Sequence, residues 1–123
     1  MRDTGNPLLS DWAIVRISPL GYIEYTAYHF TGVCEGHPLL PDGARIVTTA
    51  VQEIAEDERW GRSRSRVYGL GQKLPDDERS EELETEVTDI LYQVFGLDCD
   101  IEWISVEEWR RAMDSSSTHC GNA

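Results

Sequence analysis

The sequence predicts an α+β fold, with an antiparallel sheet of four to five strands covered by two helices in the order β-β-β-β-α-β-α. The first half of the chain holds segments rich in β-branched and aromatic residues, separated by Gly and Pro turn signals. An apolar stripe of helical period appears only in the second half. The length of 123 residues suits one domain with a modest core. We expect this domain at 11–113, between a flexible lead-in at 1–10 and a flexible tail at 114–123.

Two strands are expected to open the sheet. Residues 12–18 (WAIVRIS) are rich in β-formers and are followed by the turn signature PLG at 19–21. Residues 22–30 (YIEYTAYHF) are largely apolar or aromatic on both alternating faces, which predicts a central strand covered on both sides. Because a turn is all that separates them, we expect the two strands to pair as a hairpin.

Two further strands are expected before the helical half. Residues 32–43 are loop-like and end in the strong turn sequence Pro-Asp-Gly. Residues 45–55 (RIVTTAVQEIA) begin with a β-branched run that favours a strand, although the end of this segment could equally be helical. A turn at Gly61 then leads into residues 62–70 (RSRSRVYGL), which alternate in polarity and are assigned to a fourth strand.

The acidic stretch from Asp76 to Glu108 holds the main predicted helix. Its apolar residues recur at i, i+4, i+7, i+8 and i+11 and therefore share one face; they are Leu83, Val87, Ile90, Leu91 and Val94. Gly96 is expected to end this helix in the left-handed conformation. Residues 100–104 (DIEWI) predict a short strand. Ser105 and the Glu three positions later match a capping box, so a last helix should run to about Met113.

The expected core combines the apolar faces of these elements. Its members are Trp12, Ile14, Val15, Ile17, Ile23, Tyr25, Val47, Val51, Leu83, Val87, Ile90, Leu91, Val94, Trp103 and Trp109.

The charge of the chain is strongly segregated. The formal net charge is −12, and thirteen acids lie between Asp76 and Glu108 against the single base Arg79, while residues 1–75 carry nine acids and eight bases. Such a charge disfavours direct binding to nucleic acid or to an anionic membrane and favours a basic protein surface as partner. The residues expected to contact that partner are Glu81, Glu82, Glu84, Asp89, Asp98 and Asp100. Solubility alone is the alternative explanation.

Three arginines at alternate positions form a second charged feature. Arg62, Arg64 and Arg66 would share one face of the fourth strand and could bind an anion such as phosphate. The favoured alternative is internal, because the acidic helix begins about ten residues later and could fold back to neutralise this arginine ladder.

Catalytic and metal-binding patterns receive less support. Cys34 and His37 have C-x₂-H spacing, but His119 and Cys120 are adjacent and poorly placed to chelate one ion with them, so no metal and no cofactor are expected. His29 lies in an aromatic strand, where a packed, hydrogen-bonded histidine is the ordinary explanation. No nucleophile elbow is present. A non-catalytic protein is expected, with a small cysteine- or metal-dependent enzyme as the alternative.

The sequence also indicates the compartment. No apolar run approaches the length of a membrane span, and the first residues lack the apolar core of a signal peptide. The odd number of cysteines, Cys34, Cys99 and Cys120, is most simply explained by free thiols in a reducing environment. We therefore expect a cytoplasmic protein; the oligomeric state is left open.

Two short runs carry a resemblance. The runs WGRSRSRVYGLG at 60–71 and EWISVEEW at 102–109, with the small size and the acidity, resemble small uncharacterised accessory proteins of bacteriophages and prophages. Such proteins include inhibitors of host defence nucleases, among them anti-CRISPR proteins. The resemblance implies an accessory gene product, located in the host cytoplasm if it is phage-encoded. The acidic surface itself is similar to the charge display of nucleic-acid mimics, which occupy basic, nucleic-acid-binding surfaces. A phage assembly or structural component is the further alternative.

Overall fold

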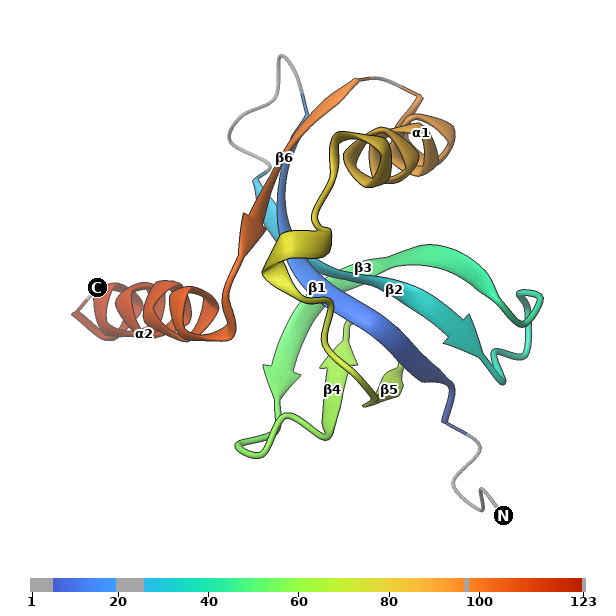
Figure 1. Cartoon of the computed structure of the whole chain (residues 1–123). Helices are drawn as coiled ribbons and strands as arrows, with labels where there is room; N and C mark the ends of the chain where they lie inside the picture. The colour runs from blue at the N-terminus through green and yellow to red at the C-terminus, as the bar shows by residue number, and fades with distance from the viewer. Residues whose placement is uncertain (1–5, 20–25, 97, 123) are drawn as a thin grey trace.

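Strands fill the first half of the described chain and helices dominate the second, which confirms the predicted α+β class (Figure 1). The computed structural model describes residues 6–19, 26–96 and 98–122, the side chains of 115–122 excepted. Within these ranges the elements are β1 (Leu8–Pro19), β2 (Ala27–Glu35), β3 (Ala44–Ile54), β4 (Trp60–Ser63), β5 (Val67–Leu70), the 3₁₀ helix η2 (Asp76–Glu78), α1 (Glu81–Phe95), β6 (Cys99–Ile104) and α2 (Val106–Asn122).

The first five strands form a closed ring. Each of β1 to β4 pairs antiparallel with the next strand in sequence. The ring closes where β5 pairs parallel with the start of β1, so that Leu8 lies opposite Gly69 and Leu9 opposite Leu70. The sixth strand, β6, pairs antiparallel with the other end of β1, from Ile14 onward, and forms the edge of the sheet. Strand β1 is therefore shared by the ring and by the outer pair.

Trp12 marks the point where β1 changes partners. The register of β1 against β2 shifts between Ser10 and Ala13. At this shift the Trp12 amide donates to the Gln72 carbonyl (3.2 Å), and the Leu74 amide donates to the Trp12 carbonyl (2.8 Å). The buried Trp12 indole also donates to the carbonyl of residue 71 (3.0 Å). These three bonds attach the segment before η2 to β1 and thereby set where α1 begins.

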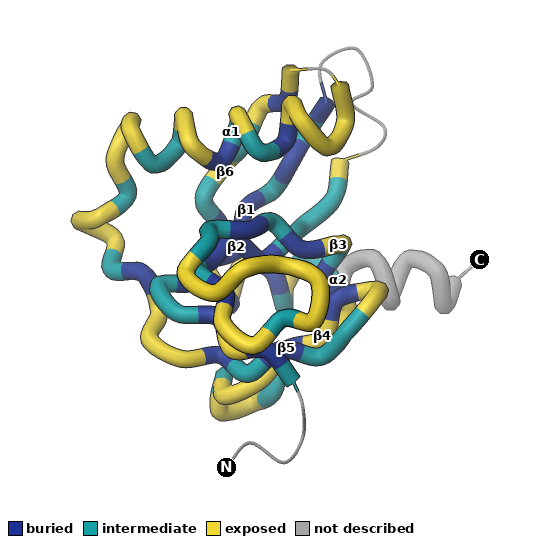
Figure 2. The backbone as a smooth tube through the Cα atoms, turned by 90° about the vertical axis from the view of Figure 1, so that its right-hand side faces the viewer, coloured by how far each residue is buried: buried dark blue, intermediate teal, exposed yellow. Residues whose placement is uncertain are grey.

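Two clusters of buried side chains lie on the two faces of β1. The larger joins the inside of the ring to the start of α2; its members are Leu9, Trp12, Ile14, Phe30, Cys34, Ile46, Val51, Ile54, Tyr68, Leu70, Ile104, Val106 and Trp109. The smaller lies between β1, β6 and α1 and comprises Val15, Ile17, Val87, Leu91 and Cys99. Figure 2 shows the buried positions concentrated along the strands. Adjacent β1 residues feed different clusters because successive side chains of a strand point to opposite faces.

The helix ends follow the predicted capping chemistry. The Ser80 hydroxyl accepts a hydrogen bond from the Leu83 amide (3.1 Å) at the start of α1, and Gly96 ends this helix with φ of 75°. At the start of α2 the Ser105 hydroxyl accepts from the Glu108 amide (3.0 Å), while the Glu108 carboxylate accepts from the Ser105 amide (2.9 Å). The predicted capping box and the predicted glycine stop are confirmed.

The predicted fourth strand over 62–70 is wrong, because this segment is the hairpin β4–β5. Its chain reverses after Ser63, whose amide donates to the Arg66 carbonyl (2.9 Å). The Ser63 hydroxyl accepts from the Ser65 and Arg66 amides (3.3 Å each). A serine that bonds local backbone in this way offers the chain an alternative to a continuous strand ladder.

The predicted loop over 32–43 is partly wrong, since its first four residues belong to β2. Gly32 pairs with Ile46 of β3, and it lies so close to β1 that a Cβ atom there would be 3.1 Å from the Ser10 carbonyl oxygen. The glycine thus permits close strand packing here instead of breaking the strand. The turn at 41–43 is confirmed, with Gly43 at φ of 87° and its amide donating to the Cys34 carbonyl (2.9 Å).

The boundaries differ at both ends of the domain. β1 begins at Leu8, within the predicted lead-in, because Leu9 is fully buried in the ring. α2 continues to Asn122 instead of ending near Met113; no proline interrupts this segment. The predicted turn residues Leu20 and Gly21, the predicted strand segment 22–25 and the predicted core residues Ile23 and Tyr25 lie outside the described residues.

The predicted core is largely confirmed. Eight predicted members are buried: Trp12, Ile14, Val15, Ile17, Val51, Val87, Leu91 and Trp109. Four are half-buried: Val47, Leu83, Ile90 and Trp103. Val94 is wrong, since it is 67% exposed; it lies in the last turn of α1, beside a cleft instead of the sheet.

Leu91 and Val94 provide a matched pair for testing the packing of α1. Leu91→Ala should lower the free energy of unfolding by about 2–5 kcal/mol, because the side chain is 1% exposed and its removal leaves a cavity. Val94→Ala should change the stability by less than about 0.5 kcal/mol. Urea denaturation of the three proteins checks this. Equal losses for both variants would contradict the placement of α1.

Gly61 tests the packing inside the ring. A Cβ atom at this position would lie 2.5 Å from Cζ of Phe30, so Gly61→Ala should destabilise the protein by about 1–3 kcal/mol through overpacking. In a Phe30→Leu background, which lacks that ring atom, the additional loss caused by Gly61→Ala should shrink. A double-mutant cycle by urea denaturation measures the coupling. Strict additivity would show that the two residues do not meet.

Candidate functional site

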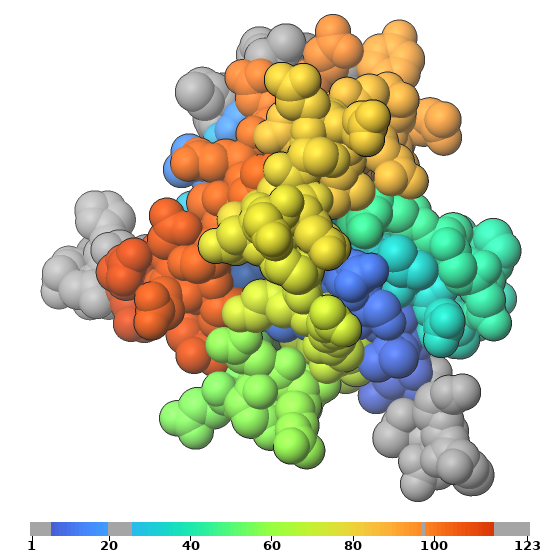
Figure 3. Space-filling view, in the orientation of Figure 1, coloured from blue at the N-terminus to red at the C-terminus, as the bar shows by residue number. Residues whose placement is uncertain are grey.

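The acidic segment folds onto one side of the molecule. Figure 3 shows η2, α1 and β6, coloured yellow to orange, next to one another on this face. Glu82, Glu86 and Asp89 are all exposed on α1. Their spacing of four and three residues places them in one row along the helix, with Glu86 at the side of α1 that borders Arg45 of β3. Like charges at such spacing repel one another, so this row does not stabilise the helix.

Arg45 ties the acidic helix to the sheet. Its side chain is only 8% exposed, with Nε 3.9 Å from a carboxylate oxygen of Glu86 and Nη1 donating to the Thr31 hydroxyl (3.4 Å). Burial lowers the pKa of Arg45, and the nearby carboxylates of Glu86 and Asp11 oppose that shift. The guanidinium group of Arg45 is thus engaged in contacts within the domain.

Arg79 is held internally in the same way. Its Nη2 lies 3.3 Å from the Asp76 carboxylate, and its guanidinium group lies 5.6 Å from the centre of the Trp103 ring, a cation–π arrangement. The Trp103 indole in turn donates to the Glu84 carboxylate (3.1 Å). Glu84 is one of the six acids expected to contact a partner. It is half-buried, and its bond to Trp103 fastens α1 to β6.

The other five predicted contact residues remain available to solvent. They are Glu81, Glu82, Asp89, Asp98 and Asp100, and we call them the acidic face. All five are exposed. None of them forms an ion pair with another of the described residues. They extend from the first turn of α1, along a helix of roughly 22 Å by its rise per residue, to the start of β6.

The arginine ladder does not form. Arg62 lies on β4 and pairs with Glu53 of β3 (3.2 Å), whereas Arg64 and Arg66 lie in the turn after β4. The predicted neutralisation of the acidic helix by these three arginines is therefore wrong; Arg45 pairs with Glu86 of α1, and Arg79 pairs with Asp76 of η2. Binding of an anion by Arg62, Arg64 or Arg66 stays a prediction.

The residues with metal-ligand spacing are engaged elsewhere. Cys34 is fully buried in the ring. Burial raises the pKa of its thiol, and the negative charge of the nearby Asp42 raises this pKa further. His37 accepts a hydrogen bond at Nδ1 from the Leu39 amide (3.0 Å). Across the described residues no three His, Cys, Asp or Glu side chains gather in a way that could hold a metal ion. The side chains of His119 and Cys120 lie outside the described residues.

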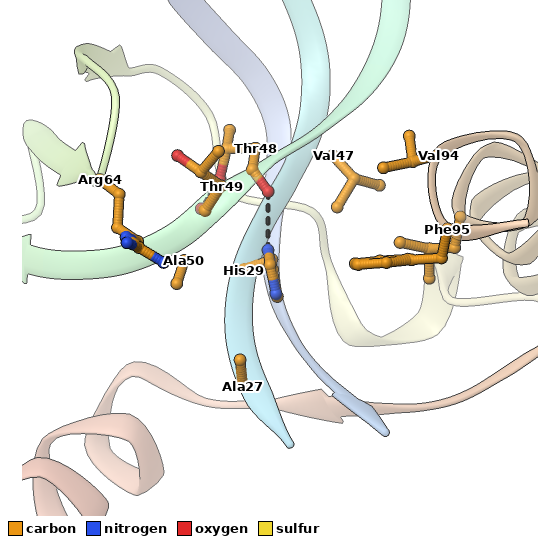
Figure 4. A pocket seen from close by; sticks show the side chains of 10 residues that line it. Ala27, His29, Val47, Thr48, Thr49, Ala50, Arg64, Val94 and Phe95 are labelled. Carbon is orange, nitrogen blue, oxygen red and sulfur yellow. Dashed lines mark hydrogen bonds between the residues drawn. The ribbon is translucent and has the colours of Figure 1, made fainter. Parts of the chain in front are cut away.

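A cleft between β3 and the end of α1 was not predicted from the sequence (Figure 4). His29 lies in it, and its Nδ1 is 2.7 Å from the Thr48 carbonyl oxygen, which confirms the prediction of a hydrogen-bonded histidine. Because a carbonyl can only accept, Nδ1 carries the proton and Nε2 has a free lone pair in the neutral ring. Burial lowers the pKa of His29, and the bond to Thr48 partly opposes this.

Comparison with protein-family models, with curated proteins and with solved structures found no match. Among the described residues, neither helix combines the length and the apolar character that crossing a bilayer requires. The acidic face and the His29 cleft are therefore the two features from which a function can be inferred.

The burial of His29 predicts a pH effect on stability. Its pKa is lower in the folded protein than the ordinary 6.5, so the unfolded chain binds more protons below that value and His29 lowers the stability as the pH falls. His29→Asn keeps an N–H for Thr48 but cannot titrate. Urea denaturation of both proteins at about pH 7.5 and about pH 5.5 should show that wild type loses stability relative to the variant. A constant difference between the two proteins would contradict the burial of a titrating His29.

Proposed function

We propose that the protein is a non-catalytic acidic binding module that occupies a basic, nucleic-acid-binding surface of another protein. The observation that carries this proposal is the division of the charges. Arg45 and Arg79 are held in internal contacts by Glu86 and Asp76, and the acidic face is left exposed and unpaired among the described residues. Solubility does not require such a division.

The physical consequence is attraction at a distance. An unneutralised row of carboxylates presents spaced negative charges to Arg and Lys side chains, as the phosphates of a nucleic acid do. Attraction of this kind mainly raises the association rate, and it is screened over about 8 Å at physiological ionic strength. The partner class that fits this surface best is a nuclease or a defence complex with a basic groove for DNA or RNA. An inhibitor of such a complex would act by competing with its nucleic acid.

The proposal is tested by capture followed by competition. The tagged acidic protein is incubated with bacterial lysate at low salt, and the captured partner is purified. The partner should bind DNA or RNA, and a nucleic-acid duplex or single strand should displace the acidic protein from it. A captured partner that has no affinity for nucleic acid, or that binds nucleic acid and the protein simultaneously, would contradict the proposed competition.

A charge-matched pair of variants locates the binding surface. Asp89→Lys with Asp100→Lys reverses two charges of the acidic face, outside the first turn of α1. Glu35→Lys with Glu56→Lys makes the same change in net charge at exposed positions on β2 and after β3. The first variant should lower the association rate by about tenfold or more, and the second by much less.

Stopped-flow or surface-plasmon measurements at about 0.05 M and about 0.5 M salt check this, since screening should erase most of the difference between the variants. Circular dichroism establishes that both variants are folded. Equal slowing by the two variants would show that only the net charge matters, and that the acidic face is not the contact surface.

A further inference from the structure

The cleft beside His29 has the size and the walls of a small-molecule site. Its volume is about 380 Å³, toward the lower end of the range for ligand pockets. Val47 of β3 and Leu91, Val94 and Phe95 of α1 provide apolar walls. Figure 4 shows Val94 and Phe95 on one side and Arg64 on the other, with the imidazole between them. Val94 (67% exposed) and Phe95 (43% exposed) are thus exposed apolar side chains that line a cleft.

A β-bulge shapes the floor of the cleft. His29 pairs with Ala50 and Thr31 with Val47, so β3 has one residue more than β2 between these pairs. The Thr48 hydroxyl accepts from the amide of residue 30 (3.2 Å) and donates to the carbonyl of residue 49 (2.7 Å). The Thr48 carbonyl accepts the hydrogen bond from Nδ1 of His29. Bulges redirect side chains and occur often beside functional sites, and this one is held by hydrogen bonds on both strands.

Arg64 is placed at the cleft by its backbone. Its amide donates to the Ala50 carbonyl (2.9 Å), and the next amide, of Ser65, donates to the Thr49 hydroxyl (3.2 Å). The turn is therefore fastened to β3 at two successive residues. The Arg64 side chain is exposed and forms no ion pair with the described acids. A cation left unpaired beside an apolar cleft, in a chain of net charge −12, suits an anionic ligand.

We propose that this cleft binds a small aromatic carboxylic acid that also carries an N–H donor. The aromatic ring would pack against Phe95 and Val47, the carboxylate would meet Arg64, and the N–H would donate to Nε2 of His29. Each requirement follows from one chemical property of the cleft: apolar walls, an unpaired guanidinium group and an imidazole nitrogen that can only accept. This site is separate from the acidic face, and the proposal does not rest on the proposed function.

Three related probes separate the three requirements. Indole-3-propionate satisfies all of them, its primary amide lacks the charge, and its 1-methyl derivative lacks the N–H. Titration into ¹⁵N-labelled protein, followed by NMR, should shift resonances of β3 and the end of α1. The acid should bind about tenfold more tightly than the amide and roughly fivefold more tightly than the 1-methyl derivative.

Each preference should depend on one residue. Arg64→Gln should remove the preference for the acid over the amide, while Arg59→Gln, at an exposed arginine that does not line the cleft, should leave it unchanged. His29→Asn should remove the preference for the N–H over the N-methyl compound. Phe95→Ala should weaken all three probes together.

Several outcomes would overturn the proposal. They are the absence of shifts at the cleft at millimolar probe concentrations, equal affinities for the acid and the amide, and an acid preference that survives Arg64→Gln. A further contrary outcome is that the resonances of Val94 and Phe95 move with protein concentration alone. This would assign the cleft to a second copy of the chain.

Discussion

The structure depends on the sharing of one long strand. β1 closes the ring through β5 at its beginning and carries β6 at its end, and Trp12 lies where these roles meet. Trp12 fills the ring core against Phe30, with ring centres 5.9 Å apart, and its backbone binds the segment that leads to η2 and α1. A single residue thereby couples the inside of the ring to the placement of the acidic helix. Both the acidic face and the His29 cleft border this helix, so the position of both depends on how β1 places α1.

The contacts that fasten α1 explain how its charges are divided. Glu84 and Glu86 turn toward the sheet, where the Trp103 indole and the Arg45 guanidinium receive them. Hydrogen bonds and ion pairs with half-buried partners hold a helix in one orientation better than exposed pairs do, since exposed pairs contribute little. The orientation they fix leaves Glu82 and Asp89 facing outward. The exposed acids Asp100 and Glu102 lie on the edge strand β6, where charge discourages pairing with another chain.

Local sequence signals predicted local structure well and long-range structure poorly. The serine and glutamate of the capping box, Gly96 and the apolar stripe through Leu91 act within a few residues, and the structure confirms them. The closure of the ring by β5 depends on pairing between residues about sixty positions apart, which no local pattern encodes. The prediction of the arginine ladder was wrong because the chain reverses after Ser63, whose hydroxyl accepts hydrogen bonds from the next amides of the turn. The cleft was missed because its walls come from β2, β3, α1 and the turn at Arg64, and they meet only in the folded chain. The exposed acids were predicted correctly as exposed, but the internal bonds of Glu84 and Glu86 were not.

We propose that the outward surface of α1 and the start of β6 form the contact with a basic partner. Hydrogen–deuterium exchange of the protein, alone and in its complex with the captured partner, tests this claim most directly. If this surface forms the contact, amides over α1 and the first residues of β6 should exchange more slowly in the complex, with the β4–β5 hairpin unchanged. Slower exchange confined to the hairpin or to the His29 cleft, with α1 unaffected, would contradict it.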